Sequence, residues 1–83
     1  MRLDLHGSKP RWADPATDAL LEGYVAWREA SSELAAAHRR WAQSDPHDAG
    51  LAGAGYLAAL DREQKAAGVY EELVRDLSRL LKQ

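Results

Sequence analysis

Between residues 15 and 43 two kinds of side chain recur at every seventh position, and this repeat predicts one long helix. Bulky side chains occupy one row, and only alanine and glycine occupy the neighbouring row. A seven-residue spacing keeps each row on one side of an α-helix. The small row lets another helix backbone approach closely. The bulky row is Leu20, Trp27, Leu34 and Trp41, and the small row is Ala16, Gly23, Ala30 and Ala37.

Two Asp-Pro pairs predict where two helices begin. At Asp14-Pro15 and at Asp45-Pro46 the aspartate can accept a hydrogen bond from first-turn amides, and proline gives up only an amide without a helical partner. These starts give one helix over 15–43 and another over 46–81. A link this short makes the two helices antiparallel neighbours. We therefore predict an all-α fold, an antiparallel two-helix hairpin, in a single domain over residues 1–83.

The second predicted helix has more apolar surface than one neighbouring helix covers. Its apolar positions form two adjacent stripes, and a lone hairpin would expose one of them. We therefore expect two hairpins to pair as a homodimeric four-helix bundle with coiled-coil packing. The stripes contain Ala59, Leu60, Ala66, Ala67, Tyr70, Leu73, Val74, Leu77, Leu80 and Leu81. The packing seam of the two helices is predicted to contain Leu20, Gly23, Trp27, Ala30, Leu34, Ala37, Trp41, Ala59, Ala66, Tyr70, Leu73, Leu77 and Leu80.

The first turns of the second predicted helix are rich in glycine. Gly50, Gly53 and Gly55 each cost roughly 1 kcal/mol against alanine in a helix. This end of the helix is therefore weak unless another group covers it. Trp41 lies near the same turn in a hairpin, and we expect its ring to pack on the surface that the glycines leave bare.

Residues 1–13 are predicted to form a short extended arm, because apolar and polar residues alternate there and turn residues follow. Within the arm, Asp4-Leu5-His6-Gly7 resembles the DLHG tetrapeptide of Smr-type nucleases, a resemblance that implies an active-site role for Asp4 and His6. The rest of that nuclease domain is an alternating α/β fold, whereas everything after Asp14 here is predicted to be helical. The helical prediction therefore argues against the nuclease interpretation.

Size and composition favour self-association. A chain of 83 residues buries only about 60% of the surface of its unfolded form. Cysteine is absent, which excludes disulfides and cysteine-containing metal sites. Leucine and valine together number 15 and alanine 16, a composition that favours closely packed helices over a thick core. Pairing with another chain remains as the source of additional stability.

Charge and hydropathy narrow the choice of partner. A net charge of -2 and an isoelectric point near 5.9 give weak attraction to nucleic acid or anionic lipid. No apolar run reaches about 18 residues, and the N-terminus lacks the apolar stretch of a signal peptide. We expect a cytoplasmic protein that binds itself and another helical protein, but neither membrane nor nucleic acid. Eight arginines against three lysines in an alanine-rich chain are typical of GC-rich bacterial genomes.

No residue pattern predicts chemistry. The three histidines lack a Glu-x-x-His spacing, and the serines lack a nucleophile motif. We therefore expect no catalytic residues, no metal site and no cofactor. Glu63 lies at the rim of the apolar stripe, and we interpret it as a rim residue that snorkels to water or forms an ion pair, with Arg28 or Lys65 as its partner. A catalytic or ligand-binding role is the alternative.

The length of the chain and a tryptophan near the turn resemble the helical hairpins of the WXG100 secreted proteins, which implies a secreted two-helix protein. That family carries Trp-x-Gly at the turn, where this chain reads Trp41-Ala42-Gln43. Its C-terminal Tyr-x-x-x-Asp/Glu signal corresponds here to Tyr70 and Val74. Neither motif is present, so the chain is not assigned to the family.

Three functional hypotheses follow from the sequence. The first is a non-catalytic scaffold or adaptor that acts by self-association and protein–protein interaction. The second is a small regulatory or nucleic-acid-associated bundle, and the third is a secreted hairpin like those of the WXG100 proteins. The end of the first helix, His38-Arg39-Arg40, suits the helix dipole, with anion binding as the alternative. The basic residues of the second hypothesis are Arg2, Lys9, Arg11, Arg28, Arg39 and Arg40.

Overall fold

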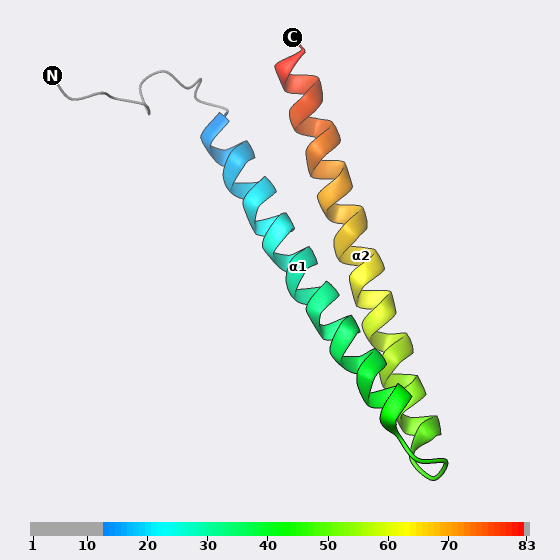
Figure 1. The fold of residues 1–83 in the computed structure, drawn as a ribbon. Coiled ribbons are helices and arrows are strands. Elements are labelled where there is room, and N and C mark those ends of the chain that lie inside the picture. Colours follow the sequence, from blue (N-terminus) through cyan, green and yellow to red (C-terminus); the bar gives the residue numbers. More distant parts are fainter. Residues whose placement is uncertain (1–12, 83) are drawn as a thin grey trace, which may run out of the picture.

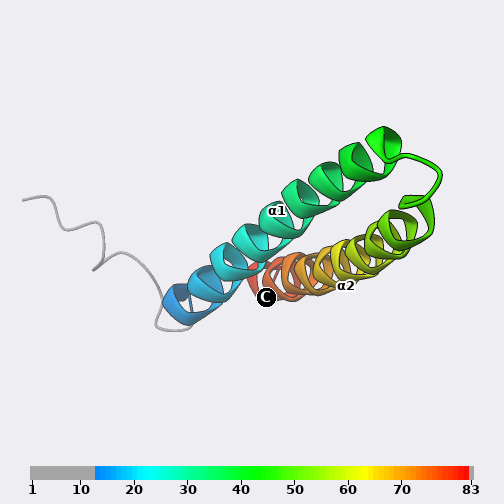
Figure 2. The same cartoon turned by 90° about the horizontal axis from the view of Figure 1, so that it is seen from below.

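The computed structural model of the chain describes residues 13–82, which form two helices joined by a short turn. Helix α1 spans Ala13–Gln43, and helix α2 spans Ala49–Leu81. The helices run antiparallel, so the end of α2 returns to the end of the molecule where α1 begins (Figure 1). Figure 2 shows the pair as a single layer of two helices. Residues 13–82 contain no strand, and the predicted all-α hairpin is confirmed.

Helix α1 begins two residues before the position predicted from Asp14-Pro15. Because the helix starts at Ala13, Pro15 is its third residue and still lies in the first turn. Backbone amides of the first turn have no helical partner, so a proline there removes no hydrogen bond. Ala13, predicted as the last residue of the extended arm, is helical. The remaining residues of the arm, including Asp4-Leu5-His6-Gly7, lie outside the described residues.

Helix α2 begins at Ala49 rather than at Pro46, because residues 46–48 form a turn. Asp45 is therefore not the helix cap that the sequence predicted: the N-cap of α2 is Asp48, whose side chain forms no capping hydrogen bond. Asp45 Oδ1 accepts a hydrogen bond from the backbone N–H of Asp48 at 3.0 Å within the turn. At the end of α1, the Ser44 hydroxyl donates to the carbonyl oxygen of Trp41 at 2.7 Å. These bonds within the turn satisfy backbone groups that the helix ends leave unpaired.

The contact between the helices is made of small residues. Among residues 15–82 the buried hydrophobic side chains are Ala30, Ala37 and Ala59, and Gly23 is also buried. A Cβ atom at Gly23 would lie 2.7 Å from Cδ1 of Leu73, which shows how closely α2 approaches there. No large side chain in this part of the chain is fully buried. The hairpin therefore has a thin core, with its large side chains at the edges of the contact.

Candidate functional site

One side of the hairpin is formed by one row of residues from each helix, and neither row contains a residue of fixed charge. Ring contacts place the α1 row there: the ring centroids of Tyr24 and Tyr70 are 5.7 Å apart, and those of His38 and Tyr56 are 5.5 Å apart. In both rows the members recur every seven residues, so each row stays on one side of its helix. We call this side the apolar face. Its members are Thr17, Tyr24, Ser31 and His38 of α1 and Gly53, Leu60, Ala67, Val74 and Leu81 of α2.

The opposite side of the hairpin, the charged face, carries residues of both signs. Arg62 Nε and Glu33 Oε1 approach to 3.7 Å across the two helices on this side. Exposed ion pairs of this kind contribute little stability. Because burying charged side chains costs free energy, we expect the charged face to stay in contact with water. Its charged members are Glu22, Glu29, Glu33, Arg40, Arg62, Lys65, Glu72, Asp76 and Arg79. The nine members of the apolar face, by contrast, include no aspartate, glutamate, lysine or arginine.

Glu63 lies between the two rows of the apolar face and is held by a tryptophan. The Trp27 indole donates from Nε1 to Glu63 Oε2 at 2.8 Å, in a partly buried position. Trp27 also stacks on Tyr70, with ring centroids 5.6 Å apart and planes 8° from parallel. The ion pair predicted with Lys65 is wrong, because Lys65 Nζ approaches Asp61 Oδ2 at 3.1 Å instead. Sequence spacing predicts that Glu63 lies on the rim. Which residue of α1 lies opposite it and donates the hydrogen bond depends on how the two helices pack.

A second aromatic cluster lies at the turn. Trp41 stacks on Tyr56 with ring centroids 5.2 Å apart, and His38 meets Tyr56 edge on. A Cβ atom at Gly53 would lie 3.3 Å from Trp41 Nε1, so the ring does cover this glycine. Nothing lies within 4 Å of a Cβ atom at Gly50 or at Gly55. The prediction that Trp41 covers the glycines is therefore right for one position and wrong for the other two.

The structure places most residues of the predicted seam between the helices and leaves two exposed. Gly23, Ala30, Ala37 and Ala59 are buried, and Trp41, 42% exposed, and Leu80 lie at the surface. The remaining seam residues are half-buried, because one neighbouring helix covers only part of a large side chain. These residues are Leu20, Trp27, Leu34, Ala66, Tyr70, Leu73 and Leu77. The sequence pattern predicts the second stripe of α2 but not the α1 row of the apolar face, whose signal is the fourteen-residue spacing, two heptads, of Tyr24 and His38.

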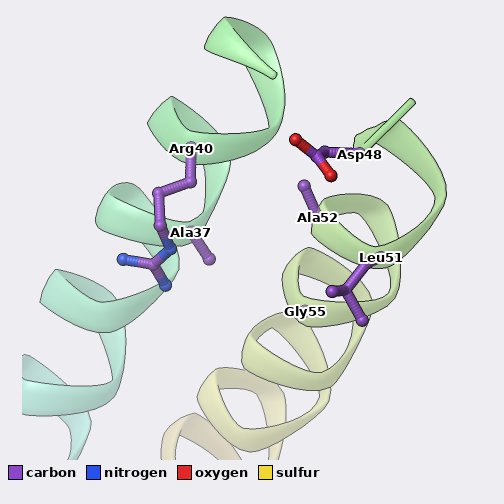
Figure 3. A pocket seen from close by; sticks show the side chains of 6 residues that line it. All are labelled: Ala37, Arg40, Asp48, Leu51, Ala52 and Gly55. Atoms are coloured by element: carbon purple, nitrogen blue, oxygen red, sulfur yellow. The ribbon is translucent and has the colours of Figure 1, made fainter. Parts of the chain in front are cut away.

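The hollows on the described surface are shallow. One lies beside the turn between the ends of the helices, and in Figure 3 the Arg40 guanidinium runs along α1 rather than toward the Asp48 carboxylate. Within the described residues, no group of three or more metal-ligating side chains occurs, and no buried side-chain polar atom lacks a hydrogen-bond partner. This part of the chain therefore offers exposed faces and shallow hollows for contact. The hollow is lined by Ala37, Arg40, Asp48, Leu51, Ala52 and Gly55.

The arginines of α1 do not form a single patch. At 100° per residue, Arg28 and Arg39 lie only about 20° apart around α1 but about 16 Å apart along it, and Arg40 lies on the charged face. Nucleic-acid affinity depends on the number of phosphates neutralised together. The described arginines therefore give little support to a nucleic-acid-binding surface.

Comparison of the chain with family models, curated proteins and solved structures finds no match. The two described helices include no stretch long and apolar enough to cross a membrane.

Proposed function

We propose that the protein is a non-catalytic helical scaffold that works by pairing with a second copy of itself through the apolar face. One observation supports this proposal above the others. The two rows of the apolar face contain no residue of fixed charge, and Glu63, the one carboxylate between them, is hydrogen-bonded to Trp27. The contact inside the hairpin fully buries only alanine and glycine. A long apolar strip is unfavourable in water, and a second hairpin laid on it removes both strips at once.

Pairing also supplies the apolar burial that the hairpin lacks. On the apolar face, Leu81 is 68% exposed and Val74 is 39% exposed in the single hairpin. Burying a large aliphatic side chain completely contributes roughly 1.5 to 3 kcal/mol, so covering several partly exposed ones adds an amount comparable with the net stability of a small domain, about 5 to 15 kcal/mol. We expect folding and pairing to be coupled, with a melting temperature that rises with protein concentration. The charged face stays in water after pairing, where it is available to another helical protein in the cytoplasm.

Sedimentation equilibrium at micromolar concentration tests the proposal. We expect a species of twice the 9.2 kDa chain mass. Val74→Glu places a charge on the apolar face and should shift the protein toward monomer, with a loss of helix at low concentration. Val69→Glu is the matched control, since Val69 lies on the other side of the same helix and is 55% exposed. It should leave both the mass and the helix content unchanged.

The outcomes separate clearly. A wild-type protein that is fully helical and sediments only as a 9.2 kDa species would refute pairing. Equal weakening by the two valine substitutions would refute the apolar face as the contact surface, because only Val74 belongs to it.

A further inference from the structure

We infer that the two copies pair with their turns at the same end, so that α1 of each copy lies against α2 of the other. This inference rests on the proposed pairing and adds its geometry. Two hairpins that face each other with twofold symmetry can be arranged in two orientations. With the turns together, α1 packs on the partner's α2. With the turns at opposite ends, α1 packs on the partner's α1, and α2 packs on the partner's α2.

The register inside the hairpin fixes which residues of α1 and α2 lie at the same height along the helix axes, which we call one level. Glu33 pairs with Arg62, and Trp41 lies over Gly53, so the numbers of two residues at one level add to about 95. With the turns together, the same relation holds between the copies. The two rows of the apolar face then interleave like knobs and holes of a coiled coil. Outward from the turn the order is Gly53, His38, Leu60, Ser31, Ala67, Tyr24, Val74, Thr17 and Leu81, which places the larger His38 and Tyr24 beside Gly53 and Ala67.

Charge at the edges of the apolar face distinguishes the two arrangements. Arg28 and Glu71 are exposed, Arg28 at the α1 edge and Glu71 at the α2 edge. With the turns together, Arg28 stands between the partner's Gln64 and Glu71. With the turns opposite, Arg28, the middle residue of Ala13–Gln43, meets the partner's Arg28. Opposite charges meet in the first arrangement and like charges in the second, so complementarity favours the turns at the same end.

The same arrangement gives a role to a glycine that the single hairpin does not explain. Nothing lies within 4 Å of a Cβ atom at Gly50, although glycine weakens a helix. With the turns together, Gly50 and Leu57 of α2 lie along the partner's Ala35 and Ala42. A row of small residues lets these two helices approach closely, and Leu57 fills the space between the two alanines.

Distance measurement between spin labels tests the arrangement directly. The chain contains no cysteine, so His47→Cys in the exposed turn gives one labelling site per copy. With the turns together, the two labels should lie less than about 30 Å apart, given helix spacings of about 10 Å. With the turns opposite, they should lie about 50 Å apart, the length of the 33-residue α2. A long distance would overturn the arrangement but leave pairing intact, whereas the absence of any coupling between labels would overturn both.

Charge reversal gives a second test that needs no label. Arg28→Glu and Glu71→Arg should each raise the dissociation constant about 2- to 30-fold, because each dimer contains the pair twice. The double variant should return to within about 2-fold of wild type, since it restores opposite charges in the reverse order. Glu72→Arg is the control for charge alone, as Glu72 is exposed on the charged face, away from the contact. If the double variant weakens pairing by as much as the two single variants added together, the Arg28–Glu71 contact is refuted.

Discussion

The indole nitrogen of Trp27 donates a hydrogen bond to the carboxylate of Glu63 across the hairpin, with 2.8 Å between Nε1 and Oε2. This bond joins the middle of α1 to the middle of α2 beside the apolar face. It gives a donor to the one carboxylate that lies between the two apolar rows. A partly buried carboxylate is tolerated only when it is hydrogen-bonded, so the indole has a specific structural role beyond its apolar surface.

Trp27→Phe tests this role. Phenylalanine keeps a ring against Tyr70 but removes the only donor of the indole, so we expect the free energy of unfolding to fall by about 1 to 3 kcal/mol. The urea midpoint, measured at fixed protein concentration, checks this. Glu63→Gln keeps an acceptor oxygen for the indole and should cost less than Trp27→Phe. A phenylalanine variant as stable as wild type would mean that water already satisfies Glu63.

Truncation of Trp41 is expected to destabilise the turn end. The ring stacks on Tyr56 and covers Gly53, but it is 42% exposed. Complete burial of an aromatic side chain makes its loss cost roughly 3 to 5 kcal/mol, so Trp41→Ala should cost about half of that. Trp41→Phe, which retains a ring over Gly53, should recover most of the loss. Thermal unfolding followed by circular dichroism provides the comparison, and a neutral Trp41→Ala would show that the stack contributes no stability.

The small row of α1 is expected to reject larger side chains. Ala30 is buried at the contact with α2, so Ala30→Leu inserts three heavy atoms where the helices are close. Overpacking of this kind costs about 1 to 3 kcal/mol. Ala26→Leu on the exposed side of the same helix is the control and should be nearly neutral, because leucine forms helix almost as well as alanine. Similar melting temperatures for the two variants would show that Ala30 does not limit the approach of α2.

Glycine positions on α2 are expected to differ in their response to alanine. Nothing lies within 4 Å of a Cβ atom at Gly68, so Gly68→Ala should stabilise the protein by about 0.5 to 1 kcal/mol through helix propensity. Each kcal/mol of added stability raises the melting temperature of a domain of this size by about 4 to 8 °C. At Gly53 the added Cβ would lie 3.3 Å from Trp41 Nε1, so Gly53→Ala should gain less or lose stability. Equal gains at both positions would contradict the close packing of Trp41 on α2.

The sequence determined the two helices and their antiparallel packing within one chain for local reasons. Seven-residue rows such as Leu20, Trp27, Leu34 and Trp41 are a property of one segment, and the Asp45-Pro46 pair marks the reversal by chemistry that acts within a few residues. Helix ends were less well determined. Pro15 is compatible with more than one position in a first turn, and the hydrogen bond from the Asp48 amide to Asp45 closes a separate turn before Ala49.

Only the tertiary structure decided which side chains meet across the helices. The partner of Glu63 depends on the relative rotation and register of α1 and α2, and a residue 36 positions away supplies the donor. The same packing left Gly50 and Gly55 uncovered while placing Trp41 on Gly53. It also brought Tyr24 against Tyr70 and His38 against Tyr56. Sequence periodicity fixes which side of a helix a residue occupies, but contact between two helices also requires their axial offset, which no single segment encodes.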